Sequence, residues 1–537
     1  MKKMYLSAAA LMCGALMFAQ SNESDVQQEG STNNSDVVQT GSINTSEVKQ
    51  RGALNVSTVS STGRNNNSKV GQVDESNTSA VTQFGGDNNS SRVSQGQIDS
   101  NGNTTRTGRD NESTVTQEGN LNRSVVRQWD LNATLGERNI SEVTQTGDGN
   151  EQNTDQFGDD NDAKMTQNGN DNESDVVQNG NNNRSRARMF GNDNVTFLNQ
   201  EGDFNNNVTE VTGSSNDVMV TQVGDDNSAL VDVSGNFNDV DWTQTGDRNN
   251  AGDDFLPGDG SNIVGDNNTH NFIQTGDDNM GSALSEGDNN EARSWQNGNE
   301  NTASTEQDGD DNTAINEQQG DNNTASIDQT SSMAQGANDN YAFNNQVSND
   351  NTSSIIQRRD DNEAYSEQFG NNNTASVTQL SSDNLSNIDQ GAFVNFGNNN
   401  SATVTQLAGD DNTSDIDQLG DFNTASAYQR GNVNMSTILS DGDNNTASLN
   451  QKGDNNTSLI DQLGMGNTAT TIQGVTGELS FDSTSNVYQT GDNHTSLVTQ
   501  KGGSLNLSNV TQTGNAHMST VMQVGSSNVS NVTQANN

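Results

Sequence analysis

The decapeptide GDNNTASIDQ occupies residues 320–329, and close copies of it recur further along the chain. GNNNTASVTQ fills residues 370–379, GDNNTASLNQ fills residues 442–451, and GDNNTSLIDQ fills residues 453–462. The glutamine that ends each copy also recurs at intervals of eleven residues over long stretches of the chain. A fixed period of this kind is the signature of a repeat architecture.

Each unit repeats the same residue types at even spacings from its glutamine. Asparagine stands six residues before the glutamine, alanine or serine four before, and valine, isoleucine or leucine two before. Even spacings place all four side chains on one face of a β-strand, whereas they would scatter around a helix. We therefore expect each unit to hold a strand of about six or seven residues with one buried face. In four of the units, the residues expected to face the core are Asn312, Ala314, Gln318, Asn323, Ala325, Ile327, Gln329, Asn373, Ala375, Val377, Gln379, Asn456, Ser458, Ile460 and Gln462.

The residues between the strands have the composition of tight turns. Glycine is followed there by aspartate and asparagine, as in the sequence GDDN. Glycine tolerates a positive φ, and aspartate or asparagine can bond the local backbone, so this composition predicts a four-residue turn. The expected turn glycines include Gly309, Gly320, Gly370, Gly442 and Gly453.

Strands and turns in strict alternation predict an all-β fold, a β-solenoid. Two units would form one rung of about 22 residues, and the frame from Asn22 to Gln534 provides about 46 units, hence about 23 rungs. Strands of successive rungs would pair at about 4.8 Å, the spacing of cross-β structure. Identical amides stacked in this way can donate to and accept from one another, so the buried asparagine and glutamine side chains would satisfy each other.

The chain begins with a segment typical of a bacterial secretory signal. Lys2 and Lys3 precede an apolar run with a plausible cleavage site near Ala19, which predicts a signal peptide at residues 1–19 and an exported, extracellular product. The only cysteine, Cys13, lies inside this run, so no disulfide is expected. No later stretch is long and apolar enough for a transmembrane helix, so membrane insertion is not expected.

Residues 20–537 are expected to form one repeat region with a few enlarged loops. The single proline, Pro257, lies in one of these loops, where it removes no ladder hydrogen bond. We interpret the insertions as loops or kinks in one solenoid, with separate domains as the alternative. The frame slips by added residues near 129–136, 251–265, 331–338, 391–396 and 474–484.

The charge of the chain narrows its range of partners. The 537 residues include 72 acidic and 23 basic side chains, which gives a net charge of −49. Nucleic acid and anionic membranes would be repelled by such a chain, so neither is expected as a partner. Only 27% of the residues are hydrophobic, a composition that without the periodicity would be typical of a disordered chain.

The repeat resembles that of the curlin family, the subunits of bacterial curli amyloid fibres, which is written S-x5-Q-x-G-x-x-N-x-A-x3-Q. Gln318, Gly320, Asn323, Ala325 and Gln329 match this motif from its first glutamine onward, and many units repeat it in phase. The resemblance implies a structural subunit that assembles with itself into fibres for cell adhesion and the biofilm matrix. It also implies a nucleator subunit and an outer-membrane secretion pore as further partners.

The chain departs from the family pattern in several respects. Asparagine leads nearly every unit, as at Asn312, where the family alternates serine and asparagine. The repeats are far more numerous than in family members, so an unusually long version is implied. The frame begins at Asn22, without the preceding segment that directs family members to the pore, so the export route is open. Complete strand units near Asn22 and in residues 527–537 favour end-to-end stacking.

Rows of like side chains predict no catalytic constellation, cofactor site or metal site. The main alternative is a monomeric acidic β-solenoid adhesin of the cell surface that binds a ligand or calcium through its acidic faces. The candidate calcium ligands are the turn aspartates Asp310, Asp311, Asp360, Asp361, Asp410 and Asp411. Ice binding is a further hypothesis, based on the threonines Thr302, Thr313 and Thr324, although the outward place before the glutamine is mixed and charged. His494 and His517 replace asparagine in their units and are expected to stack rather than to hold zinc.

Overall fold

The computed structural model describes residues 21–98, 104–129, 136–252, 260–330, 337–392 and 397–536. All the helices and strands named in these ranges are strands, with no helix among them, which confirms the predicted all-β class. The described part contains no helix that could cross a membrane. The chain divides into two compact units, Met1–Asn238 and Asp239–Asn537. The expected signal peptide at residues 1–19 and Pro257 lie outside the described residues.

The strand β35 (Thr374–Gln379) illustrates why each repeat unit forms a strand. Its sequence TASVTQ alternates, residue by residue, between more exposed and buried side chains. Ala375, Val377 and Gln379 point inward and are at most 1% exposed. The hydroxyl residues between them face outward. A strand with a single buried face requires this period of two residues.

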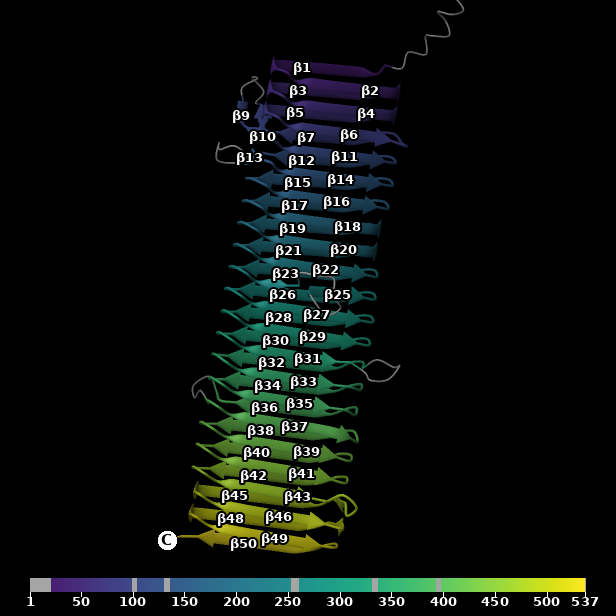
Figure 1. The fold of residues 1–537 in the computed structure, drawn as a ribbon. Coiled ribbons are helices and arrows are strands. Elements are labelled where there is room, and N and C mark those ends of the chain that lie inside the picture. Colours follow the sequence, from purple (N-terminus) through teal and green to yellow (C-terminus); the bar gives the residue numbers. More distant parts are fainter. Residues whose placement is uncertain are drawn as a thin grey trace, which may run out of the picture. The chain divides into compact units, whose positions relative to one another are not determined.

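The first unit consists of two parallel sheets, each of which takes alternate strands of the chain (Figure 1). Its first sheet contains β1 (Glu23–Ser31), β3 (Thr45–Ala53), β5 (Asn67–Glu75), β7 (Ser90–Gln95), β12 (Arg123–Gln128), β15 (Glu151–Phe157), β17 (Glu173–Asn179), β19 (Val195–Glu201) and β21 (Asp217–Val223). Its second sheet contains β2 (Asn34–Ser42), β4 (Val56–Arg64), β6 (Thr78–Phe84), β11 (Glu112–Glu118), β14 (Ile140–Thr146), β16 (Asp162–Asn168), β18 (Arg184–Asn192), β20 (Asn206–Ser214) and β22 (Ser228–Ser234).

The second unit repeats this arrangement. Its first sheet contains β23 (Asp239–Thr245), β26 (Thr269–Thr275), β28 (Glu291–Asn297), β30 (Thr313–Gln319), β32 (Tyr341–Val347), β34 (Glu363–Phe369), β36 (Leu385–Gln390), β38 (Thr413–Leu419), β40 (Met435–Asp441), β42 (Thr457–Leu463), β45 (Thr484–Asp492), β48 (Leu507–Asn515) and β50 (Val529–Ala535). Its second sheet contains β24 (Asn250–Ala251), β25 (Gly260–Val264), β27 (Met280–Glu286), β29 (Thr302–Asp308), β31 (Thr324–Gln329), β33 (Thr352–Gln357), β35, β37 (Ser401–Ala408), β39 (Thr424–Arg430), β41 (Thr446–Lys452), β43 (Thr468–Gln473), β46 (Thr495–Lys501) and β49 (Met518–Val524).

Successive strands of one sheet pair in register, so that each residue lies beside its equivalent in the next turn of the coil. Ala303 pairs with Ala325 and Gln307 with Gln329, a step of 22 residues. Because strands of the two sheets alternate along the chain, each unit is a parallel β-solenoid, as predicted. The first sheets of the two units together contain 22 strands, close to the expected count of about 23 rungs.

Insertions lengthen the step between paired residues without breaking the pairing. Ile327 pairs with Ile355 across the insertion near 331–338, where the step is 28 residues instead of 22. In the insertion at 474–484, Val475 and Glu478 form an isolated bridge. β44 (Ser480–Phe481) pairs there with β47 (Gly503–Ser504). Parts of the other expected insertions lie outside the described residues, at 130–135, 253–259, 331–336 and 393–396.

A further insertion follows Gln95, and the sequence frame did not single it out. β8 (Gln97–Ile98) pairs antiparallel with β9 (Thr104–Arg106), and β10 (Gly108–Arg109) pairs with β13 (Gly136–Glu137). The regular pairing continues from β6 to β11 over a step of 34 residues. The inserted residues are mainly polar and include glycine, like the turns between units, so their composition does not distinguish them from the repeat.

Candidate assembly site

The structure buries every core-facing residue expected from the repeat. Each of them is at most 2% exposed. The expected turn glycines all have a positive φ: 127° at Gly309, 117° at Gly320, 115° at Gly370, 112° at Gly442 and 113° at Gly453. The buried set is Asn312, Ala314, Gln318, Asn323, Ala325, Ile327, Gln329, Asn373, Ala375, Val377, Gln379, Asn456, Ser458, Ile460 and Gln462.

The buried glutamines form a ladder that runs along each sheet. Gln296 Nε2 donates to Gln318 Oε1 at 2.9 Å, and Gln318 Nε2 donates to Gln346 Oε1 at the same distance. Each glutamine also bonds the facing strand, since Gln318 Nε2 donates to the Thr302 carbonyl oxygen at 2.9 Å. One amide therefore joins successive turns of the coil and the two sheets, which compensates its burial.

The buried asparagines form a second ladder at the start of each strand. The Asn323 backbone N–H donates to Asn301 Oδ1 at 3.0 Å, and Asn323 Nδ2 donates to the same oxygen at 3.1 Å. Asn301 Nδ2 donates forward to the Gly320 carbonyl oxygen in the next turn at 2.7 Å. Asparagine thus fixes the beginning of the strand to the turns of both neighbouring rungs.

The aspartate or asparagine that follows each turn glycine has a structural role of its own. The Asp266 backbone N–H donates to Asp288 Oδ1 at 2.8 Å, and the Asp288 N–H donates to Asp310 Oδ1 at 2.8 Å. The Asp310 N–H then donates to Asn338 Oδ1 at 2.9 Å. Because aspartate and asparagine both supply this acceptor, the side chain caps the backbone of the preceding turn. The sequence signal was the frequent occurrence of Asp or Asn directly after the glycine.

The next turn residue adopts the left-handed conformation even where it is not glycine. The φ angle is 60° at Asp311, 58° at Asp361 and 60° at Asp411. Asparagine and aspartate tolerate this region better than other residues, whereas bulky residues are uncommon there. Phe422 and Val433 nevertheless occupy it, with φ of 59° and 56°. The stacked turns therefore impose the conformation on whichever residue is present.

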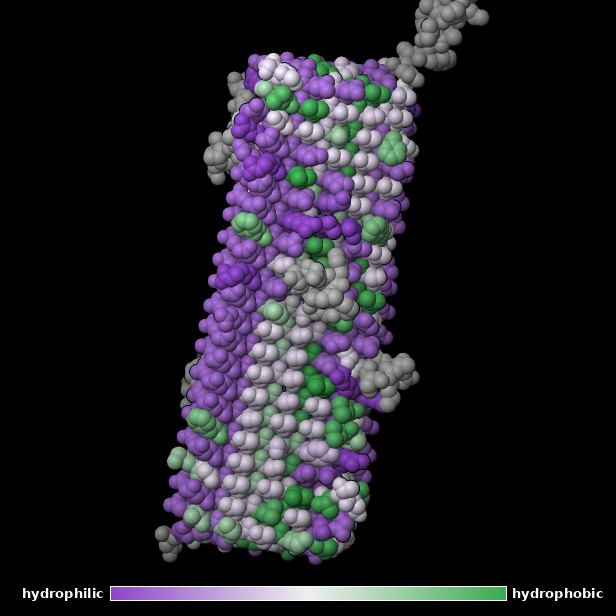
Figure 2. Space-filling view, in the orientation of Figure 1, coloured by the Kyte–Doolittle hydropathy of each residue, from purple (hydrophilic) through white to green (hydrophobic). Residues whose placement is uncertain are grey.

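The turn aspartates considered for calcium lie in one column of the second unit. Asp339 and Asp383 lie in intermediate turns of this column, and slight burial, followed by the neighbouring carboxylates, raises the pKa of each. Within the described residues, no group of three or more histidine, cysteine or acidic side chains is arranged to hold a metal ion. The column is thus an acidic edge. The first aspartate of each pair, at Asp310, Asp360 and Asp410, accepts a hydrogen bond from a backbone N–H of the preceding turn. Figure 2 shows hydrophilic residues over most of the visible surface.

Besides the turn aspartates, a set of carboxylates lies on the outer face of the first sheet of the second unit. Glu367 pairs with Asp389, and Asp389 pairs with Asp417, on the adjacent strands β34, β36 and β38. Partial burial, and after it the charge of Asp389, raises the pKa of Asp417 to about 6. Partial burial likewise raises the pKa of Glu367 and of Asp389.

The threonines considered for ice binding fall on different sheets. Thr302 pairs with Thr324 in the second sheet, whereas Thr313 lies on β30 in the first sheet. The second sheet nevertheless carries two outward columns of hydroxyl residues. Thr324, Thr352 and Thr374 are neighbours in one column, and Ser326, Ser354 and Ser376 are neighbours in the other. The column beside them, Glu306, Asp328, Ile356 and Thr378, is mixed, as the sequence indicated.

His494 and His517 occupy asparagine positions of the ladder, whereas His270 occupies the alanine or serine position of its repeat unit. The rings of His494 and His517 stack with their centres 5.2 Å apart, as expected. His270 is fully buried, and this burial lowers its pKa to about 3. Its ring nitrogens lie 2.7 Å from Ser261 Oγ and 2.8 Å from Ser285 Oγ. His270 is thus a neutral hydrogen-bonding group of the core.

Next to His270, two large side chains of one strand pair face a glycine on the other sheet. Trp242 and Phe272 stack with their ring centres 4.3 Å apart in the core. The facing strand has Gly281 at the alanine position, where an added Cβ would lie 3.3 Å from the tryptophan ring. A small residue opposite a large one keeps the spacing of the sheets. The sequence frame placed these residues correctly, but it could not show that they compensate one another.

These features define a class of protein: a parallel β-solenoid whose turns are joined by buried amide ladders. Seven segments match the sequence profile of the family described as Curlin associated repeat, at residues 158–187, 213–246, 298–330, 348–380, 409–442, 442–473 and 482–514. The chain is therefore a curlin-repeat protein, which confirms the resemblance found in its sequence. No curated protein matches the chain significantly.

Proposed function

We propose that the protein is a secreted structural subunit that stacks end to end into curli-like amyloid fibres for cell adhesion and biofilm cohesion. The curlin repeats support this function. The observation that carries the proposal is the state of the first and last described strands. The core-facing side chains of β1 are exposed, and those of β2 and β50 are only partly buried, in contrast to the buried equivalents in strands such as β35.

The ladders specify how a second copy would attach. Gln523 Nε2 donates to the Leu507 carbonyl oxygen and Gln534 Nε2 to the Met518 carbonyl oxygen, both at 2.9 Å. Interior glutamines make this bond and also donate forward to the next glutamine of their sheet. The first two ladder glutamines of a following copy, Gln28 and Gln39, would supply the acceptors for that forward bond. Because donors point one way along the ladder, the copies would all have the same direction.

Fibre formation by the purified mature protein tests this proposal. We expect fibres with diffraction spacings of about 4.8 Å along the axis and about 10 Å across it. Salt should quicken their growth, because it screens the repulsion between acidic copies. A protein that stays monomeric at high concentration and high salt would contradict the proposal and favour the monomeric adhesin.

We infer a second candidate function, ice binding, from the two hydroxyl columns of the second sheet. They form a regular outward lattice on successive strands from β31 to β35. Regular hydroxyl rows can order water, whereas the neighbouring mixed column would interrupt such a surface. Thermal hysteresis of the purified protein tests this candidate. Its loss on changing Thr352 to Lys would support ice binding, and an absence of hysteresis in the unchanged protein would dismiss it.

A further inference from the structure

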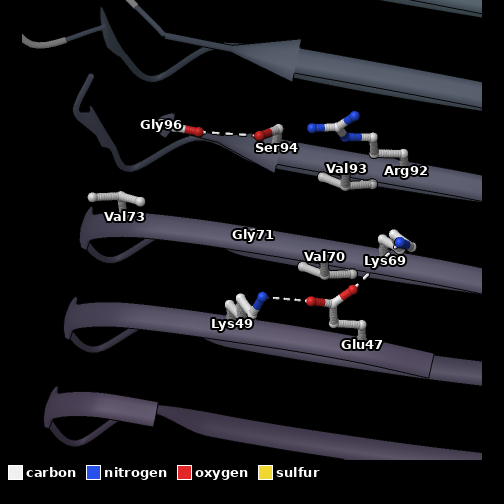
Figure 3. Close-up of a pocket in the computed structure, with 10 residues that line it drawn as sticks. All are labelled: Glu47, Lys49, Lys69, Val70, Gly71, Val73, Arg92, Val93, Ser94 and Gly96. Carbon is white, nitrogen blue, oxygen red and sulfur yellow. Dashed lines mark hydrogen bonds and ion pairs between the residues drawn. The ribbon is translucent and has the colours of Figure 1, made fainter. Parts of the chain in front are cut away.

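A hollow opens on the outer face of the first sheet of the first unit. It has a volume of about 260 Å³ and lies over β3, β5 and β7. Lys49, Lys69 and Arg92 line it, together with Glu47. Figure 3 shows Gly71 on the strand between Lys49 and Arg92, with no side chain above it.

Gly71 has no conformational reason to be glycine. It is not among the residues with a positive φ, and a Cβ added there would meet nothing nearer than Ser94 Oγ, at 4.0 Å. Glycine inside a strand weakens it and often marks a place where another group approaches closely. Gly71 pairs with Lys49 on one side and Ser94 on the other, at positions that face outward. Its effect on the structure is to keep the hollow open.

The hollow carries an excess of positive charge. Glu47 is shared by two cations, since its Oε1 lies 2.5 Å from Lys49 Nζ and its Oε2 lies 3.4 Å from Lys69 Nζ. Arg92 forms no ion pair with any residue in the described part of the chain. Three cations therefore face one carboxylate. The Arg92 side chain is exposed. A guanidinium group in such a place is well suited to bind a carboxylate through two parallel hydrogen bonds.

The same chain carries the complementary charge elsewhere. The first unit holds 16 of the 23 basic residues, whereas the second holds 40 of the 72 acidic residues and only 7 basic ones. The column formed by Glu367, Asp389 and Asp417 lies on three adjacent strands. Each of these carboxyl groups has a pKa raised by its surroundings, so a nearby cation would stabilise its ionised form.

The two surfaces have matching periods. Lys69 and Arg92 are neighbours in one outward column, and Lys49 lies beside Gly71 in the next outward column of the same sheet. The three carboxylates form one column on three adjacent strands, and the strands that carry either set are spaced by about 4.8 Å. We propose that the hollow over Gly71 binds the Glu367, Asp389 and Asp417 column of a second copy and so joins copies side by side. This contact requires only the folded chain and does not depend on end-to-end stacking.

Zero-length cross-linking tests this contact directly. Equal amounts of isotopically light and heavy full-length protein are mixed at low salt and coupled with a carbodiimide, which joins ammonium and carboxyl groups in contact. We expect light–heavy cross-links from Lys49 or Lys69 to Asp389, Asp417 or Glu367, and their loss at high salt. Cross-links from these lysines only within one copy, or only to other carboxylates, would overturn the proposal.

Paired charge reversals provide a stricter test. The double variant K69E/R92E and the double variant D389K/D417K should each reduce the light–heavy cross-links between Lys49 and Glu367 about tenfold, because like charges then face each other. Mixing the two variants should restore these cross-links, since D389K/D417K retains the hollow and K69E/R92E retains the carboxylates. The control R184E/R186E changes the same number of charges on β18 and should have no effect. An equal loss in the control, or no recovery in the mixture, would contradict a specific contact.

Filling the hollow separates shape from charge. Gly71→Thr should leave thermal unfolding unchanged or slightly raised, because the position is open and threonine favours strands. It should nevertheless reduce the light–heavy cross-links about tenfold, since the hollow is then closed to an incoming side chain. Undiminished cross-linking by this variant would show that the hollow takes no part. Binding of a soluble polyuronate with no light–heavy cross-links would replace the proposal with an acidic polysaccharide ligand.

Discussion

At the scale of the residue, the core is polar, and its ladder amides satisfy one another. Asn323 and Gln318 are buried, and each donates to and accepts from its copies in neighbouring turns. The position two residues before the glutamine is apolar in most units, as at Val377, although polar residues such as Asn316 and Asn344 occupy it in others. A narrow core of this kind depends on strict alternation, because a one-residue shift would exchange the two faces of every strand.

Val377→Asp should destabilise its part of the coil by at least about 3 kcal/mol, because the carboxylate would be buried without a partner. Thr378→Asp, one residue along and facing outward, is the matched control and should be nearly silent. Since each turn contacts only its neighbours, hydrogen exchange of β33, β35 and β37 is the appropriate measurement. An equal loss of protection in the two variants would refute the assignment of the two faces.

The raised pKa of Asp417, about 6, makes the coil sensitive to pH near β38. The folded state binds this proton more tightly than the unfolded state, so the stabilising effect is full below the unfolded pKa and is lost as the pH rises through about 6. Asp417→Asn should therefore stabilise the strand at pH 7, by on the order of 1 kcal/mol after allowance for solvent screening. The gain should vanish at pH 4. Denaturant unfolding at the two pH values measures it, and an equal gain at both would show that the ionised carboxylate is not the source of the instability.

At the scale of the element, the turn determines how closely successive units can stack. A typical turn has two residues with positive φ, a glycine and the residue two places later, such as Gly309 and Asp311. The glycine also lies against the next turn of the coil. At Gly442, an added Cβ would lie 2.2 Å from the Gly464 carbonyl oxygen. Glycine is thus required at this position by both conformation and space.

Gly442→Ala should destabilise the neighbouring turns by about 1–3 kcal/mol or more, because it combines a strained φ with a backbone clash. Gly71→Ala is the matched control, since that glycine lies in a strand with open space around it. The control should leave stability unchanged or improve it slightly. Hydrogen exchange of the two flanking turns compares the variants, and a similar cost at both glycines would show that turn geometry is not the determinant.

The repeat in the sequence was sufficient to predict the strand, its buried face and the turn glycine. These follow from period and residue type alone, as in the unit from Asn323 to Gln329. The hydrogen bond from a turn N–H to the Asp or Asn of the next turn could not be predicted, because it depends on how turns stack. The insertion after Gln95 was missed because its residues resemble those of a turn. The compensation between Trp242 and Gly281 was missed because these residues belong to two different repeat units, and the period does not specify which repeat units contact each other.

At the scale of the whole molecule, the chain combines a uniform interior with an uneven surface charge. The ladders repeat in both units with the same partners and similar distances. Charge, in contrast, is divided, since most basic residues belong to the first unit. Under the two proposals, growth would follow the ladders of the interior, and contacts between the sides of copies would take their specificity from the outer faces.

Val532→Asp should suppress elongation while most of the coil remains folded. Val532 lies on the last strand, packed against the core on one side, and a second copy would cover its other side. Burying an unpaired carboxylate in that contact should slow seeded growth about tenfold or more. Thr533→Asp, which faces outward, is the control and should grow like the unchanged protein. Equal growth of the two variants would mean that this end of the coil is not the growing surface.

Electron cryomicroscopy of fibres grown from the mature protein tests the central claim most directly, because it resolves the contact between successive copies. We predict that β49 and β50 of one copy pair in parallel with the first two strands of the next, with Gln534 donating to Gln28 and Gln523 to Gln39. The spacing across this junction should equal the spacing of about 4.8 Å inside each copy. Fibres in which these strands stay uncovered, with copies joined only through their outer faces, would contradict it.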